Sequence, residues 1–138
     1  MQQFLTPVLA LILWTFVMWV VMYKRRIPAM NAIHRNPQKF IEDPELWAKM
    51  PSSAVNAADN YNHLHEQPVI FYALMFYISL SQQSDNIFMY LAWAYVGIRI
   101  VHSLVQITTN KVMHRFTFFA LGSLVLMIIG IRAAIGLF

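Results

Sequence analysis

The segment from Phe4 to Tyr23 carries no charged residue across 20 positions. A helix rises about 1.5 Å per residue, so a segment of this length covers the roughly 30 Å hydrocarbon core of a bilayer. Three further apolar segments follow along the chain. We therefore predict an all-α integral membrane protein, a four-helix bundle whose transmembrane helices lie at about residues 4–23, 60–81, 87–107 and 116–138 of one domain covering residues 1–138.

The composition favours membrane lipid as a partner and excludes chemistry based on protein sulfur. Hydrophobic residues make up 59% of the chain and charged residues 12%, and the mean hydropathy is +0.51. The net charge of +4 comes from basic residues beside the apolar segments, which indicates anionic lipid headgroups and no nucleic acid as the partner. The chain has no cysteine, so it has no disulfide, no thiolate nucleophile and no thiolate ligand for a metal.

The basic residues also predict the orientation of the chain in the membrane. Six of them lie in the long connection 24–59, two more (Lys111 and Arg115) lie between the third and fourth helices, and the connection 82–86 has none. By the positive-inside rule, the connection 24–59 is cytoplasmic and both termini lie on the non-cytoplasmic side, in the cytoplasmic membrane if the chain is bacterial. The connection 24–59 contains four prolines and is predicted to be irregular apart from one short amphipathic turn around Pro44 to Met50. Arg132 lies near the opposite interface, where its side chain can snorkel.

Two polar stripes interrupt the apolar helices. On the predicted second helix, polar residues recur at helical spacing at Asp59, Asn62, His63 and Glu66. On the third helix, the same spacing is found for Arg99, His102, Ser103, Gln106 and Asn110. An ionisable group inside a membrane costs about 2.5–3.5 kcal/mol and needs a partner, so we predict an ion pair between Glu66 and Arg99. Spacing alone leaves two interpretations open, a polar contact that joins the helices and a ligand-binding or catalytic site.

A metal site is not predicted, although His63, His65, Glu66 and His102 offer nitrogen and oxygen ligands. His63 and His65 are two residues apart, which places them about 200° apart around a continuous helix. Both side chains therefore cannot bind one ion unless the helix is broken at this point.

The sequences ADNYNHLHEQPVIFYAL and VGIRIVHSLVQITTNKVMHRFTFFALG resemble the MAPEG family, the membrane-associated proteins of eicosanoid and glutathione metabolism. The likeness is greatest to the uncharacterised bacterial members and covers nearly the whole chain, including the number of helices and the long first connection. It implies a homotrimer in which glutathione binds between neighbouring subunits, in a pocket open to the cytoplasm.

Position by position, the resemblance implies a set of site residues. Glu66 matches the glutamate that binds the amino group of glutathione, and Arg115 matches the catalytic arginine near its sulfur. Arg99 and His102 match the Arg-x-x-His motif of the prostaglandin E synthase branch. Asn62 and His63 stand at two further cofactor-binding positions.

Several positions depart from the family pattern. The enzymes have asparagine where this chain has His63, and they tend to have arginine at the positions of Asn62 and Asp59. An arginine binds a carboxylate through a bidentate fork, so its loss weakens the expected carboxylate clamp. Gln106 and Phe119 stand where the enzymes carry hydroxyl-bearing aromatic residues. The three basic residues that follow the first apolar segment offer replacement cations: Lys24, Arg25 and Arg26.

Two functions are consistent with these residues. The first is a glutathione-dependent transferase or peroxidase that acts on a lipophilic electrophile delivered from the bilayer, with Arg115 stabilising the thiolate. The second is a non-catalytic lipid-binding or scaffold protein that keeps the same fold. The sequence leaves open whether the protein is an enzyme.

Overall fold

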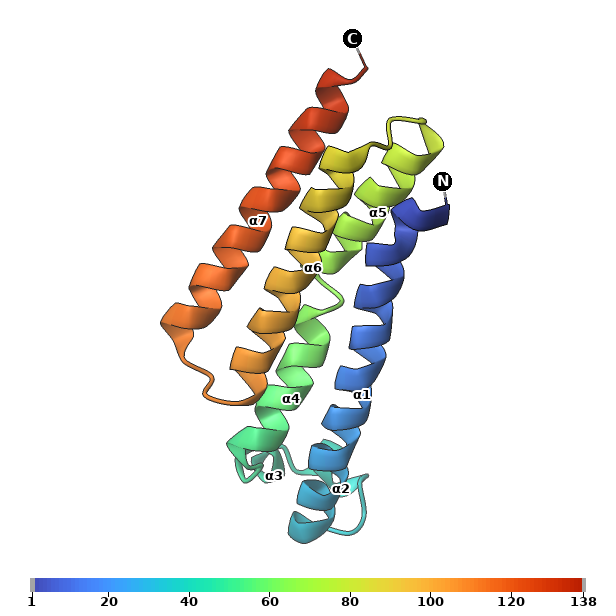
Figure 1. Ribbon diagram of the computed structural model, residues 1–138. Coiled ribbons are helices and arrows are strands. Elements are labelled where there is room, and N and C mark those ends of the chain that lie inside the picture. The colour runs from blue at the N-terminus through green and yellow to red at the C-terminus, as the bar shows by residue number, and fades with distance from the viewer. Residues whose placement is uncertain (1, 138) are drawn as a thin grey trace.

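The structure is a computed structural model that describes residues 2–137. These residues form one 3-10 helix and seven α-helices: η1 (Gln2–Leu5), α1 (Thr6–Ile33), α2 (Lys39–Glu42), α3 (Glu45–Ala48), α4 (Ser52–His63), α5 (Gln67–Leu80), α6 (Asn86–Ile107) and α7 (Val112–Ile135). The long helices run side by side, with α6 between α7 and α1, and α4 and α5 follow one another end to end (Figure 1). The short helices α2 and α3 lie together at one end of the bundle.

The first helix continues well beyond the predicted end at residue 23. Its 28 residues extend about 42 Å, which exceeds the roughly 30 Å of the hydrocarbon core. The charges of Lys24, Arg25 and Arg26 end the apolar segment but not the helix, because lysine and arginine are good helix formers. The helix ends where His34 adopts an extended backbone with φ −154°.

The connection between the first two membrane segments is more helical than predicted. Pro44 and Pro51 precede α3 and α4 directly, and α4 begins at Ser52 instead of near residue 60. The short turn predicted around Pro44 to Met50 is present as α3. The prediction that the rest of the connection is irregular is wrong, because these prolines lie at helix starts, where a missing N–H group is not needed. The side chain of Phe40 is buried and packs on Trp47, with the two ring centroids 5.0 Å apart.

The second membrane segment is not the continuous helix predicted for residues 60–81. It is divided at Leu64–Glu66, and Glu66 has a non-helical backbone with φ −99° and ψ −97°. Pro68 supplies the physical reason: it has no N–H group for the carbonyl of Leu64, and its ring would clash with that carbonyl in a continuous helix. The 14 residues of α5 extend only about 21 Å, so the second crossing also needs the end of α4.

The remaining two segments differ less from the prediction. The helix α6 begins one residue before the predicted 87–107, and α7 (Val112–Ile135) begins four residues before the predicted start at 116. The predicted end of this helix at Phe138 lies outside the described residues. Among residues 2–137, three helical segments are long and apolar enough to cross a membrane: Gln3–Ile33, Asn86–Ile107 and Val112–Ile135. Together with the divided α4–α5 segment, they account for four crossings.

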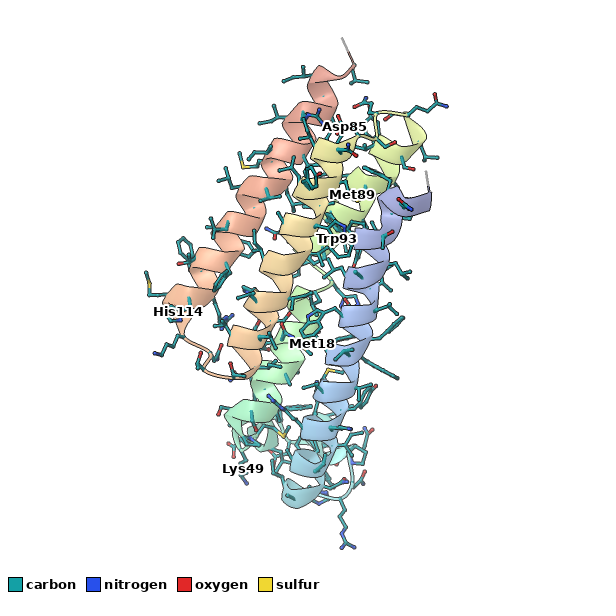
Figure 2. The ribbon with its side chains drawn as sticks, viewed as in Figure 1. Met18, Lys49, Asp85, Met89, Trp93 and His114 are labelled. Carbon is teal, nitrogen blue, oxygen red and sulfur yellow. The ribbon has the colours of Figure 1, made fainter. Side chains whose placement is uncertain are left out.

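The bundle has an apolar core and an apolar outer surface. Leu11, Phe71 and Tyr95 are fully buried, and the rings of Phe71 and Tyr95 lie 4.7 Å apart between centroids. Met18, labelled in Figure 2, lies on the inner side of α1 and is also buried. Large apolar side chains such as Leu80 (82% exposed) cover the outside of the bundle. Apolar surface on this scale is typical of a protein that faces lipid.

Polar contacts fix the end of the bundle where α5 turns into α6. Asp85 caps α6 by accepting a hydrogen bond from the backbone N–H of Phe88 (2.9 Å) and forms two hydrogen bonds with Arg132 on α7 (2.9 and 2.6 Å). The Arg132 guanidinium holds the pKa of Asp85 below its usual value. Arg132 therefore has an ionic partner at this end of the bundle. Lys49 and His114 lie toward the opposite end (Figure 2).

Candidate functional site

A cavity of about 300 Å³ lies where the junction of α4 and α5 faces α6 and α7. Its polar lining consists of His63, Glu66, Gln67, Arg99, His102 and Arg115, and its apolar lining of Val112, Phe116 and Phe119. Five of the six predicted site residues therefore line one cavity, and Asn62 does not. The volume is at the lower end of the range for small-molecule sites.

The break in the second membrane segment creates one wall of this cavity. His63 is the last residue of α4 and Glu66 directly precedes α5, so both flank the non-helical turn. Irregular backbone inside a membrane is tolerated where it is buried in protein or lines a water-filled cavity. The exposed carboxylate of Glu66 makes no capping hydrogen bond to α5 and remains free to contact a ligand.

Two histidines from different helices lie near each other at the cavity wall. The rings of His63 and His102 are 6.3 Å apart between centroids, and Nδ1 of His63 lies 3.1 Å from the side-chain amide of Gln106. His65 points elsewhere, because its Nδ1 bonds the carbonyl of Tyr61 at 2.8 Å. Within residues 2–137, no group of three or more His, Cys, Asp or Glu side chains is arranged to hold a metal ion.

Arg99 does not form the predicted ion pair with Glu66. Its Nη2 donates a hydrogen bond to the backbone carbonyl of His63 at 3.1 Å, and the ion pairs found among residues 2–137 involve neither Glu66 nor Arg99. The reason is the helix break: it leaves the last carbonyl of α4 available, and a guanidinium satisfies such a helix end well. Arg99 is only 1% exposed, whereas Glu66 remains on the surface of the cavity.

Arg115 lines the cavity from the start of α7. Its Nη1 donates to Oδ1 of Asn110 at 2.8 Å, and the amide of Asn110 donates to Oδ1 of Asn56 on α4 at 2.9 Å. Asn110 has a left-handed backbone (φ 48°), which asparagine tolerates better than most residues. This chain of contacts orients a half-buried guanidinium toward the same cavity as Glu66 and His102.

Asn62 and Asp59 line a second cavity of about 260 Å³, between α1, α3 and α4. Arg26 lines it too, and its guanidinium lies 4.9 Å from the ring centroid of Trp47. Arg25 is engaged elsewhere, because its Nη1 donates to the carbonyl of Ile107 at 2.8 Å. Of these two basic residues, Arg26 is the one that reaches a cavity.

Gln67 is a cavity residue that the sequence analysis missed. Its amide donates to Oγ of Ser123 on α7 at 2.6 Å, and its Oε1 accepts a hydrogen bond from the hydroxyl of Tyr95 on α6 at 3.2 Å. The sequence feature that could have indicated Gln67 is its polar side chain, which stands immediately before the apolar run that begins at Pro68. Its role was hidden because both partners come from distant parts of the chain.

Comparison with protein families matches residues 4–135 of the chain to the MAPEG family. The match covers all four membrane segments and every residue that lines the two cavities. The chain belongs to the MAPEG family. The resemblance inferred from the two polar stripes is therefore confirmed, as is the four-helix membrane fold. The chain is an integral multi-pass membrane protein. No curated protein and no solved structure matches it significantly.

Proposed function

We propose that this MAPEG protein is a glutathione-dependent transferase or peroxidase that acts on lipophilic electrophiles. The observation that supports the proposal best is the position of Glu66 and Arg115, which line one cavity from the α4–α5 junction and from α7. A carboxylate suits the amino group of glutathione, and a guanidinium suits its thiolate. Family membership adds support, because glutathione is the cofactor of many members.

The proposed chemistry depends on positive charge near the sulfur. A cation beside a thiol favours the thiolate, which is the reactive nucleophile. Arg115 supplies this charge, and Arg99 and His102 line the same cavity. The apolar side chains of Val112, Phe116 and Phe119 border the cavity on α7 and are 45–72% exposed. They offer a surface to a lipophilic substrate that arrives from the bilayer.

A homotrimer would complete the glutathione site. Within one chain Asn62 and Arg26 line a cavity different from that of Glu66 and Arg115, so these four residues do not share one cavity. We propose that the second cavity of one subunit faces the first cavity of its neighbour. Arg26 then contributes the cation that the family pattern places at the positions of Asp59 and Asn62, and it serves the carboxylates of glutathione.

A non-catalytic lipid-binding function is the second candidate. The observation in its favour is the lack of a hydroxyl group on two residues near the proposed thiolate: Phe119 lines the cavity, and Gln106 is buried against His63. A protein that only binds an amphiphile needs the apolar wall of α7 and the cationic interior of the cavity but no proton donor.

Calorimetric titration with glutathione tests the first proposal directly. We expect saturable binding to the detergent-solubilised protein, and no detectable binding at millimolar glutathione would reject the glutathione function. Crosslinking in mild detergent tests the assembly. Monomers alone across a series of protein concentrations would reject the homotrimer.

The variant Arg115→Lys distinguishes a catalytic role of Arg115 from a role in anchoring the helix at the membrane surface. We expect the variant to insert and assemble normally but to lose most thiol-transfer activity toward a chlorodinitrobenzene, because lysine replaces a planar fork by a point charge. Arg35→Lys is the matched control, since Arg35 is exposed and lines neither cavity. Equal activity of parent and Arg115→Lys would assign Arg115 to membrane anchoring alone.

A further inference from the structure

The turn between α4 and α5 is fixed on its α4 side by Arg99. The carbonyl of His63, the last residue of α4, accepts a hydrogen bond from Nη2 of Arg99 at 3.1 Å and a longer one from the backbone N–H of Glu66 at 3.3 Å. A positive group at the end of a helix is favoured by the partial negative charge of the last carbonyls. Arg99 thus ties the end of α4 to the middle of α6.

Gln67 fixes the same turn on its α5 side. Its amide donates a hydrogen bond to Ser123 at 2.6 Å, and its carbonyl oxygen accepts one from Tyr95 at 3.2 Å. The hydroxyl of Ser123 in turn donates a hydrogen bond to the carbonyl of Phe119 at 2.9 Å. The absence of a side chain at Gly122 leaves space for the amide group of Gln67, since a Cβ at residue 122 would lie 3.3 Å from Oε1 of Gln67. The first residue of α5 is therefore held by both α6 and α7.

Only Leu64, His65 and Glu66 lie between these two fixed points. We propose that Arg99 and Gln67 are positioning residues: they hold the helix break in one geometry and so direct the carboxylate of Glu66 into the cavity. What Glu66 then binds, the amino group of glutathione, rests on the proposed function. The geometry of residue 66 itself does not depend on that function.

Arg25 offers an internal comparison for the role of Arg99. It caps another helix end in the same way, with Nη1 donating to the carbonyl of Ile107, the last residue of α6, at 2.8 Å. This second cap lines neither cavity. Loss of either cap affects a helix end, but only the loss of Arg99 affects the direction of Glu66.

A single cysteine at position 66 tests the positioning without any ligand. The chain has no other cysteine, so Glu66→Cys gives a unique thiol whose reaction with a water-soluble maleimide can be timed. In the cavity this thiol lies near guanidinium groups that favour the reactive thiolate. We expect addition of Gln67→Met, or of the milder Ser123→Ala, to lower the labelling rate about tenfold as residue 66 turns away.

Thr117→Ala is the matched control for Ser123→Ala. The hydroxyl of Thr117 also bonds the carbonyl four residues earlier on α7 (2.9 Å), but it does not contact Gln67. It should leave the labelling rate of the Glu66→Cys protein unchanged. Rates within about threefold of that protein for both Gln67→Met and Ser123→Ala would overturn the proposal that Gln67 positions residue 66.

A pair of ligands tests Arg99 and separates this inference from the proposed function. Hydrogen bonds to charged groups predict that the parent binds glutathione about tenfold to a hundredfold more tightly than an analogue lacking the amino group. We expect this ratio to fall below about threefold in Arg99→Met and to persist in Arg25→Met. If the parent binds glutathione and Arg99→Met weakens both ligands equally, the positioning role of Arg99 is wrong. If the parent binds neither ligand, the glutathione function is wrong, and the labelling rates still decide whether Gln67 positions residue 66.

Discussion

Replacing Arg99 by methionine should change the stability of the bundle very little. The variant loses one hydrogen bond from a charged donor to the carbonyl of His63, which costs about 1.5–3 kcal/mol. It also removes a guanidinium that is 1% exposed and whose Nε and Nη1 have no hydrogen-bond partner among residues 2–137. Burying such a charge inside a membrane costs about 2.5–3.5 kcal/mol. The two effects nearly cancel, so we expect Arg99→Met to lie within about 2 kcal/mol of the parent.

The sequence-based ion pair between Glu66 and Arg99 predicts a different result. Removing one partner of a buried ion pair costs about 3–5 kcal/mol, and the double variant Glu66→Gln, Arg99→Met should recover much of that loss. Because the structure contains no such pair, we expect the coupling free energy of this cycle to be below about 0.5 kcal/mol.

Unfolding in mixed detergent micelles, followed by circular dichroism, measures both quantities. The parent, the two single variants and the double variant are compared at equal protein and detergent concentration, because the apparent stability of an oligomer depends on both. A loss above about 3 kcal/mol in Arg99→Met, recovered in the double variant, would refute the assignment of Arg99 to the carbonyl of His63.

Three further predictions follow from other parts of the bundle. Gly122→Ala should destabilise the protein by about 1–2 kcal/mol, because the new Cβ would lie 3.3 Å from Oε1 of Gln67. Gly130→Ala is the control, since a Cβ there has no atom within 4 Å and should not destabilise the protein. Equal thermal stability of the two variants would contradict the close contact between residue 122 and Gln67. Asp85, whose pKa is lowered by Arg132, stabilises the fold above its unfolded pKa of about 3.9, and this contribution is lost as the pH falls through its lower folded pKa. The unfolding midpoint of Asp85→Asn should therefore depend less on pH below about 4 than that of the parent. On intact cells, an impermeant maleimide should label Ser84→Cys but not Asn36→Cys, and the reverse pattern would overturn the predicted orientation.

The number and approximate location of the membrane segments could be predicted from the sequence because they depend on local composition. Runs of apolar residues such as Phe4 to Tyr23 have few alternatives to a membrane helix. The ends of these helices could not be predicted equally well. The helix α1 continues to Ile33, ten residues beyond the uncharged segment that ends at Tyr23, since charged residues limit the hydrocarbon segment without disfavouring a helix.

Most of the residues that line the cavity could be predicted from the sequence, but the contacts that these residues make with one another could not. Helical spacing placed His63 and Glu66 on one face and Arg99 and His102 on another, and these four residues do line one cavity. The same spacing grouped Asn62 with them, although Asn62 lines the other cavity. Spacing rules assume a continuous helix, and that assumption fails at the break before Pro68.

The break also explains why the most plausible ion pair in the sequence is not formed. A search for partners by charge alone pairs Arg99 with Glu66, because no other carboxylate lies at that depth. A helix that ends inside the membrane adds a competing acceptor, the backbone carbonyl of His63, which a search among charged side chains does not consider. Once Arg99 occupies that carbonyl, the carboxylate of Glu66 remains free at the cavity surface, where a binding function needs it. The polar stretch before Pro68 is therefore better understood as the two sides of a broken helix than as one face of a continuous helix.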